Sequence, residues 1–380
     1  MRSATTLLVF CVAGLLALGL TMLFSASNSS AGAPAEGAKF LMAQLKWCIL
    51  AVPAAVAAAC FDYRLLKKWW PVLLAITVLL LAYVLAFERP VNGARRWIVK
   101  GGYQFQPSEM AKLALIIFLA WYGERFSHRM KSFLHGVVIP CAAAGVVLGL
   151  IFRGPDVGTT LLLTCVCGIV LLSAGARARY LVLPAVILLT VVGAFVATNS
   201  NRSERIYSWL NLEETRRDRG IQQWQAQLAI GAGGLAGKGL GEGRQKMGWV
   251  PEHHTDFIFA VVAEELGLIG GLFVILGFMG VLVAGMWIAL HASDVFGALL
   301  AVGITSLIAV QAFINIGVVT ATLPNKGLAL PFISYGGSSL LFMLVAVGVL
   351  LSVARQARPR VVEAGSTRNP FSDLPLAEAG

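Results

Sequence analysis

Asp256 is the acidic residue that the sequence places best for general-base chemistry. It belongs to the segment PEHHTDF at 251–257, where a long polar stretch runs into an apolar one. A carboxylate at such a boundary is partly desolvated, and desolvation raises its pKa toward that of a useful base. The position fits equally well with Thr255 or Asp256 capping the helix that follows. His253 and His254 are interpreted as interfacial surface residues in preference to ligands or proton carriers.

Four further ionisable residues fall inside predicted membrane spans, where such side chains are costly and indicate function by default. Glu109 and Lys112 stand at i, i+3 on one helix face, which favours an internal ion pair. Lys112 is also long enough to reach an anionic group beyond the helix end. Glu264 and Glu265 lie about two turns into the span after Asp256. Their structural alternative is pairing with a buried base.

Asp156 lies in the segment RGPDVGT at 153–159, at the edge of another apolar run. A carboxylate at this place can cap the next helix or contact a ligand. The sequence leaves the two roles equal.

The segment LPNKGLALPFISYGGSS at 323–339 interrupts the helical pattern with two prolines and paired glycines. Non-helical backbone at membrane depth persists only where it is buried or lines a cavity. Gln311 and Asn315 precede it at i, i+4 spacing. We expect a polar cavity that opens outward, with helix packing through small residues as the alternative. Its expected lining is Lys326 and the hydroxyls of Ser334, Ser338 and Ser339.

Composition requires that lipid surrounds much of the chain. Of 380 residues, 58% are hydrophobic and 13% charged, against roughly 25% charged in soluble proteins. The predicted fold is an all-α polytopic membrane protein of about ten spans. The first apolar run is interpreted as an uncleaved helix because it is long enough to span. The expected spans are 5–24, 41–60, 70–87, 108–123, 133–152, 158–174, 179–198, 257–289 (long and glycine-rich, so tilted or kinked), 295–322 and 331–353.

Lys and Arg residues collect in alternate short loops, as the positive-inside rule expects of cytoplasmic loops. Their distribution places both termini in the cytoplasm and a large loop, 199–256, outside between spans 7 and 8. Residues 1–360 then form one transmembrane domain, and 361–380 a cytoplasmic, disordered tail. The cytoplasmic set is Arg2, Arg64, Lys67, Lys68, Arg125, Arg129, Lys131, Arg177, Arg179, Arg355, Arg358, Arg360 and Arg368.

The external loop 88–107 is basic against this bias, which indicates an anionic ligand at the outer surface. It carries Arg89, Arg95, Arg96 and Lys100 against Glu88. The loop 199–256 carries eight basic residues, but long loops are exempt from the rule. Its glycine-rich run at 230–241 lacks Walker spacing and is interpreted as flexible backbone near a bulky ligand. The sequence shows no zinc spacing, nucleotide fingerprint or nucleic-acid signature.

The order of these motifs resembles the SEDS family of bacterial wall proteins, the group containing FtsW, RodA and SpoVE. The resemblance spans nearly the whole chain, and Lys326-Gly327 looks more like the FtsW and SpoVE branch than RodA. Its markers are GARRWI at 93–98, QPSE at 106–109, PDVGT at 155–159, the segment 251–259 with EELG at 264–267, and ISYGGSS at 333–339.

The resemblance implies a peptidoglycan glycosyltransferase that polymerises lipid II on the outer face of the cytoplasmic membrane. It implies septal synthesis with a class B penicillin-binding protein and other divisome proteins as partners. Asp256 matches the family's essential aspartate, so we hypothesise that it deprotonates the attacking sugar 4-hydroxyl, with inversion at the anomeric carbon. Whether a divalent cation, Mg²⁺ or Mn²⁺, helps to stabilise the leaving group stays open.

The remaining site residues are expected to bind substrate or to support those that do. Arg95, Arg96 and Lys326 are expected to stabilise the pyrophosphate leaving group. The other expected substrate-binding residues are Lys112, Asp156, Ser334 and Ser338, and the supporting residues are Glu109, His254, Thr255, Glu264 and Glu265.

Three other functions stay open. A lipid II flippase or other transporter would use the intramembrane charges as a path, although we find no inverted repeat between the halves. A non-catalytic scaffold leaves those charges unexplained. A polymerase of the RodA type would serve elongation instead of division.

Overall fold

The computed structural model describes residues 1–27, 34–90, 94–100, 103–198, 200–243 and 255–357. His254 and the tail 361–380 lie outside these ranges. The helices are α1 (Arg2–Ser27), α2 (Pro34–Cys60), η1 (Tyr63–Leu65), α3 (Leu66–Phe87), α4 (Pro107–Arg125), η2 (Ser127–Arg129), η3 (Leu134–Val138, a π-helical turn), α5 (Ile139–Arg153), α6 (Val157–Ser173), α7 (Ala178–Ala197), α8 (Ser200–Leu210), α9 (Ile221–Gly233), α10 (Ile258–Leu290), α11 (Val295–Val319) and α12 (Gly337–Gln356).

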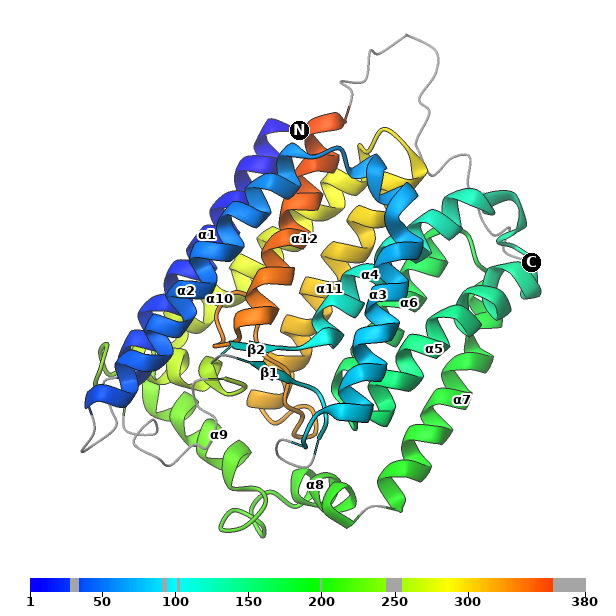
Figure 1. Ribbon diagram of the computed structural model, residues 1–380. Helices are drawn as coiled ribbons and strands as arrows, with labels where there is room; N and C mark the ends of the chain where they lie inside the picture. Colours follow the sequence, from blue (N-terminus) through cyan, green and yellow to red (C-terminus); the bar gives the residue numbers. More distant parts are fainter. Residues whose placement is uncertain (28–33, 91–93, 101–102, 199, 244–254, 358–380) are drawn as a thin grey trace.

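Each expected span coincides with a helix, and together the long helices form one bundle (Figure 1). Eight helices in the described part of the chain are long and apolar enough to cross a membrane. Of the other two, α6 has 17 residues and α4 carries charged side chains. The membrane-protein fold is therefore confirmed, while the count of ten spans stays a prediction.

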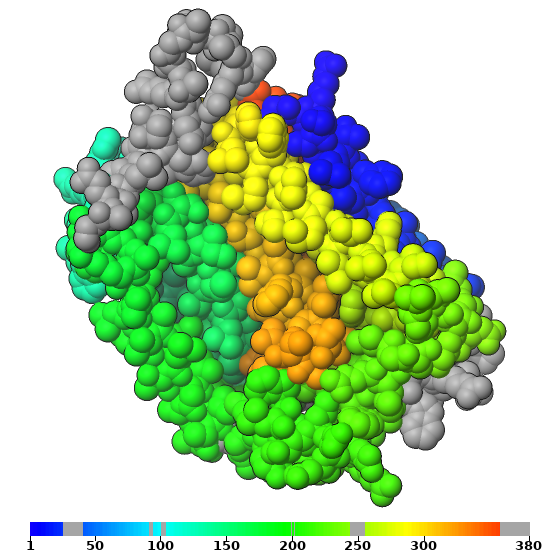
Figure 2. Space-filling view, turned by 180° about the vertical axis from the view of Figure 1, so that it is seen from behind, coloured from blue at the N-terminus to red at the C-terminus, as the bar shows by residue number. Residues whose placement is uncertain are grey.

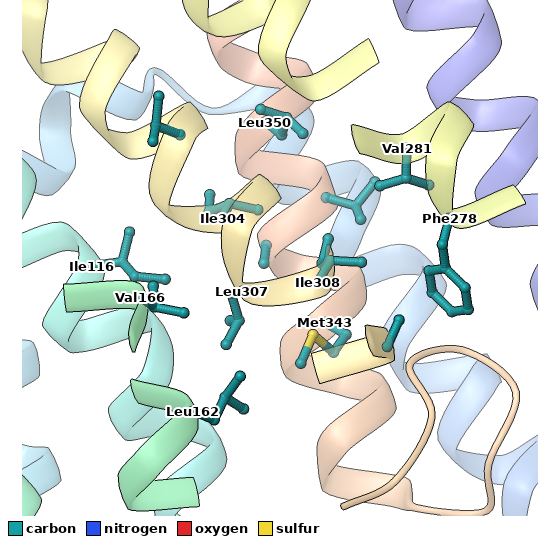
Figure 3. Close-up of a cluster of buried hydrophobic side chains, with 14 of the residues drawn as sticks. Ile116, Leu162, Val166, Phe278, Val281, Ile304, Leu307, Ile308, Met343 and Leu350 are labelled. Carbon is teal, nitrogen blue, oxygen red and sulfur yellow. The ribbon is translucent and has the colours of Figure 1, made fainter. Parts of the chain in front are cut away.

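Helix α11 forms the centre of the bundle. Its side chains are mostly apolar and mostly buried, as expected of a helix enclosed by others. Ile304, Leu307 and Ile308 meet Ile116 of α4 and Met343 of α12, with α6 and α10 on the remaining sides (Figure 3). This packing holds α4, α6, α10 and α12 in fixed positions, and their ends carry the site.

Small residues allow the outer helices to approach closely. A Cβ atom at Gly348 of α12 would collide with the carbonyl oxygen of Ala55 on α2. On α1, Leu8, Leu15 and Met22 recur every seven residues and are fully buried, and Leu15 packs on Gly277 of α10. Lipid tails are as apolar as these side chains, so the hydrophobic effect does not drive helices together within a membrane. Dispersion contacts of this kind hold them together instead.

Helix α10 is broken at Gly267, which has φ +66° and ψ −159°. The expected kink in this long span is confirmed. The glycine-rich loop after α9 fills the break: the N–H groups of Lys238 and Gly239 donate to the carbonyls of Glu264 (3.1 Å) and Glu265 (3.0 Å). Cβ atoms at Gly237 or Gly267 would collide with opposing backbone. Gly237 therefore allows close backbone packing, a role that the interpretation of this run as flexible backbone near a ligand did not include.

Two short strands were not expected in an all-α chain. β1 (Ile98–Lys100) and β2 (Tyr103–Phe105) pair antiparallel, with Ile98 opposite Phe105. The hairpin, α8, α9 and the loop 320–336 gather at one end of the bundle (Figure 1). We call this the Asp256 end; the opposite end carries Arg64, Lys67, Glu124 and Asp294.

Candidate active site

Asp256 lies at the start of α10, half-buried, with its carboxylate directly against Gly327. The N-cap residue of α10 is Phe257, whose side chain cannot accept a hydrogen bond, so neither Thr255 nor Asp256 is the N-cap. The Asn315 amide of α11 donates to the Asp256 carbonyl at 2.8 Å. The backbone of Asp256 is thus fixed to the bundle core.

The loop 320–336 is held by side chains that the sequence suggested as cavity lining. Asn315 also donates to the Leu328 carbonyl (2.6 Å), and Gln311 donates to the Ala329 carbonyl (2.8 Å). These buried amides satisfy non-helical backbone that would otherwise be costly at this depth. The loop therefore has a defined position next to Asp256.

Ser334 and Ser338, expected to bind substrate, are buried and bonded to backbone. The Ser334 hydroxyl donates to the Thr255 carbonyl (2.6 Å) and accepts from the Leu330 N–H (2.8 Å). The Ser338 hydroxyl accepts from the Gln106 N–H at 3.3 Å. In this structure both hydroxyls position the segments around Asp256.

Lys326 extends from the same loop over the start of α6. Its Cγ and Cε atoms lie 3.3 Å from where a Cβ at Gly158 would stand. Burial lowers the pKa of Lys326 to about 8, opposed by Asp156 and reinforced by Arg202, Arg205 and Arg96. Lys326 is therefore an ammonium group in a partly dehydrated, cation-rich place.

Asp156 caps α6 and at the same time faces the cations. Its carboxylate accepts from the Thr159 N–H (3.1 Å), the Thr159 hydroxyl (2.9 Å) and the Gln106 amide (3.4 Å). Arg96 Nη1 lies 3.7 Å from Oδ1. Of the two roles left open by sequence, capping is observed.

The two arginines of the 88–107 loop point to different partners. Arg95 is exposed and donates to the Leu85 carbonyl at 2.8 Å, near the end of α3. Arg96 is half-buried beside Asp156. Both line a cavity of about 20 Å³, room for roughly one water molecule. Of the two, Arg96 is the one within ion-pair distance of Asp156 and the one whose charge acts on Lys326.

Glu109 and Lys112 form the expected buried ion pair, with Nζ 2.7 Å from Oε1. Lys112 also donates to Gln311 at 2.9 Å, and Gln311 holds the Ala329 carbonyl. The pair thus supports the loop 320–336 through Gln311. Lys112 was expected to contact substrate directly, but its observed contacts are to Glu109 and Gln311.

Glu264 and Glu265 lie at the break in α10. Glu264 pairs with Lys238 at 2.9 Å, and Glu265 accepts from the Ser25 hydroxyl (2.6 Å) and the Gly241 N–H (3.1 Å). Glu264 thus has a basic partner, as in the structural alternative, although Lys238 is partly exposed. These contacts fasten the glycine-rich loop and α1 to α10.

The sequence did not single out four residues that belong to the site region: Gln106, Thr159, Arg202 and Arg205. Gln106 and Thr159 stand inside quoted motifs, so their positions were available as a signal. Arg202 and Arg205 were counted only as part of a basic segment. Their proximity to Lys326 depends on α8 folding back across the bundle end.

No group of three His, Cys, Asp or Glu side chains suited to a metal ion occurs among the residues that the structure describes. The described donor set near Asp256 gives no basis for placing Mg²⁺ or Mn²⁺.

An apolar cavity of about 420 Å³ opens between α2 and α12 on one side and α3 and α4 on the other. It runs from Met110 near the Asp256 end to Phe61 and Asp62 at the opposite end. Apolar side chains such as Trp69, Leu113 and Phe342 line almost all of it.

Comparisons with known proteins agree over almost the whole chain. A Geobacter metallireducens protein named "Probable peptidoglycan glycosyltransferase FtsW" is 41% identical over 343 residues, covering 90% of this chain and 92% of the relative. "Stage V sporulation protein E" of Bacillus subtilis is 41% identical over 362 residues, covering 94% and 98%.

Solved structures agree as well. One described as "Structural coordination of polymerization and crosslinking by a peptidoglycan synthase complex" contains a chain with a TM-score of 0.75 and 30% identity, covering 92% of this chain and 96% of that one. The Thermus thermophilus rod shape determining protein RodA gives a TM-score of 0.68 and 29% identity, covering 93% and 97%. Residues 5–359 match the family FTSW_RODA_SPOVE, described as "Cell cycle protein". The chain therefore belongs to the FtsW, RodA and SpoVE family of cell cycle proteins.

Proposed function

We propose that this chain is a peptidoglycan glycosyltransferase that polymerises lipid II for septal wall synthesis. One observation carries the proposal: the dipeptide Lys326-Gly327 joins a carboxylate to a group of cations. Asp256 lies against Gly327, and Lys326 reaches over Gly158 toward Asp156 and Arg96. The two contacts come from adjacent residues, whose Cα atoms are about 3.8 Å apart, so we assign the base and the charge-neutralising groups to one substrate site.

This arrangement suits transfer of a sugar from a lipid diphosphate. The Asp256 carboxylate takes the proton of the acceptor 4-hydroxyl. At the same time the hydroxyl oxygen forms a bond to the donor's anomeric carbon. The bond from that carbon to the diphosphate oxygen breaks, and its electron pair leaves with the lipid diphosphate. Because the attack is direct, the anomeric configuration inverts. Arg96 and Lys326 neutralise the charge that develops on the leaving group.

The apolar cavity between α2, α3, α4 and α12 supports a lipid-linked substrate. Its lining is almost wholly apolar. At the Asp256 end it is bounded by residues of α4 that follow Glu109 in sequence, such as Met110. A polyprenyl chain lying there would keep its hydrocarbon out of water while its head group remains at the Asp256 end.

We place the Asp256 end outside the cytoplasmic membrane, with both termini in the cytoplasm. The support is the positive-inside rule, since Arg64, Lys67 and Arg355 lie at the opposite end. A class B penicillin-binding protein is the proposed partner, with other divisome proteins. The support for a cross-linking partner is the related solved structure, which is described as a complex that coordinates polymerization and crosslinking; the divisome partners follow from the proposed septal role.

The decisive test is purified full-length protein in detergent with fluorescent lipid II, followed by gel separation of glycan strands. A detergent micelle has no second compartment, so polymer requires an enzyme and not a flippase. Absence of polymer, even after a class B penicillin-binding protein is added, would overturn the proposal.

A further inference from the structure

Helix α8 lies across the Asp256 end of the bundle and is anchored to the loop after α11. Trp209 donates from Nε1 to the Ala321 carbonyl at 2.8 Å. In the next helix, α9, Gln223 donates to the carbonyls of Val318 and Leu323, each at 2.9 Å. Figure 2 shows this segment running below the end of α11. Side chains on α8 are thus held next to the loop that carries Lys326.

Arg202 of α8 is half-buried, with its guanidinium 3.9 Å from the centre of the Phe195 ring. Its Nη1 is shielded from solvent and has no hydrogen-bond partner among the described residues. Arg96 Nε is in the same condition. Buried donors are nearly always paired in native proteins. Both arginines lie close enough to Lys326 for their charges to act on it, so their two unpaired guanidinium donors indicate a missing acceptor near Lys326.

The charges in this region are also out of balance. Arg96, Arg202 and Arg205 all lower the pKa of Lys326, and Asp156 is the carboxylate that raises it. The Asp156 oxygens are already engaged by Thr159 and Gln106. Burial, together with the charge of Arg205, lowers the pKa of Arg202. Among the described groups whose charge acts on Lys326, three are cations and one, Asp156, is a carboxylate, so an entering anion would be attracted by Arg96, Arg202, Arg205 and Lys326 together.

We infer that Arg202, with Arg205 beside it, completes a diphosphate-binding site whose other side is formed by Arg96 and Lys326. This rests on the proposed function and adds to it the residues that recognise the leaving group. Guanidinium groups on two separate elements can engage two linked phosphates at once, each through paired N–H donors. The site should therefore prefer a lipid diphosphate to a lipid monophosphate.

The same chemistry could come from the head group of a bulk phospholipid, so the test compares sources. Purified full-length protein in detergent is titrated with undecaprenyl diphosphate, undecaprenyl monophosphate and phosphatidylglycerol, and each Kd is measured by native mass spectrometry. The variants are R202Q, R205Q and R202K. R217Q is the matched control, because Arg217 is an exposed arginine of the same segment. Thermal unfolding of each variant verifies that it is folded.

We expect R202Q to raise the Kd for the diphosphate by roughly tenfold to a hundredfold. R205Q, on the exposed side, should act in the same direction but less. R202K should fall between R202Q and the native protein, and R217Q should not differ from it. Removing the Arg202 charge should also move the alkaline limit of kcat/KM to higher pH, an effect that packing on Phe195 would not produce.

Two results would overturn the inference. Equal losses for diphosphate, monophosphate and phosphatidylglycerol would make this a general site for anionic lipids. An unchanged diphosphate Kd in both R202Q and R205Q would leave Arg202 as a packing residue. Polymer formation together with unchanged binding would defeat only this inference. Arginine-dependent binding without polymer in the native chain would defeat only the proposed function.

Discussion

The carboxylate of Asp256 lies so close to Gly327 that any side chain at residue 327 would collide with its Oδ2 atom. The contact joins the start of α10 to the loop before α12, two segments about seventy residues apart in sequence. The Asn315 amide fixes both sides of this contact, because it donates to the carbonyls of Asp256 and Leu328. The position of the proposed base therefore depends on the absence of a Cβ atom at 327.

Gly327→Ala should lower the polymerisation rate by about a hundredfold, because the carboxylate must move by an ångström or so. The rate is measured with fluorescent lipid II in detergent. Gly145→Ala is the control, since a Cβ there meets nothing within 4 Å. Near-normal polymerisation by the 327 variant would show that the Asp256 carboxylate is not held in a reactive position.

Asp256→Asn should abolish polymer formation, because an amide of the same shape cannot accept the hydroxyl proton. Loss of a single electrostatic donor costs about 10²–10³ in rate, whereas loss of the base should leave nothing measurable. Asp218→Asn is the control, since Asp218 is an exposed carboxylate of the segment between α7 and α10 that also carries Asp256. Glycan strands from the Asp256 variant at near-normal rate would make the assignment wrong.

The sequence predicted the helices well because each span is signalled by its own hydrophobicity. It failed where the backbone depends on distant partners. The start of α12 was placed at 331, but the helix begins at Gly337, since the preceding loop is held by Gln311 and Ser334. The glycine-rich run could not be assigned to the break in α10, because a backbone-to-backbone contact has no side-chain signature.

The site was predictable in its chemistry and less so in its geometry. Asp256 was chosen because a carboxylate at a span boundary is partly desolvated, and Asp156 because a carboxylate at such a boundary can cap a helix or contact a ligand. Lys326 was chosen because it lies in a helix-breaking segment expected to line a cavity. The hydroxyls of Ser334 and Ser338 were expected to face substrate, but they bond to backbone of Thr255 and Gln106. The sequence gives no direction for a short side chain on a non-helical loop, so this distinction required the structure.

Polymerisation should lose activity as the pH rises through about 8, because burial lowers the pKa of Lys326 to about 8 from an ordinary 10.5. The ammonium form, to which we assign neutralisation of the leaving group, is present below this pH and lost above it. The kcat/KM profile reports ionisations of the free enzyme and should show the alkaline limit. Lys326→Arg, which stays protonated, should move that limit upward.

Stability provides the control for this prediction. Between about pH 8 and 10.5 the unfolded chain binds the proton at Lys326 and the folded chain does not. The free energy of unfolding therefore rises with pH in that window. A Tm that fell in step with activity would mean that the enzyme unfolds, and would contradict the role given to Lys326.

Lys112→Met should destabilise the protein by about 3–5 kcal/mol, because it leaves the buried Glu109 charge without its partner. The Gln311 amide also loses its donor, so the loop 320–336 should loosen. The double variant E109Q/K112M removes both charges and should recover much of the stability. Thermal unfolding in detergent measures both, and equal losses in the single and double variants would contradict an ion-pair origin.

Gly267→Ala should destabilise the protein and release the glycine-rich loop from α10. The φ and ψ angles at 267 lie in a region open essentially to glycine, with strain of about 1–3 kcal/mol for other residues. The new Cβ would also collide with the N–H of Gly237. Gly271→Ala, four residues later on the same helix, is the control, because the nearest atom to its Cβ is 3.7 Å away. We expect a lower Tm and faster proteolysis within 234–243 for the first variant only. Equal behaviour of the two variants would show that the loop does not depend on the break, and that Glu264 and Glu265 hold it by their side chains alone.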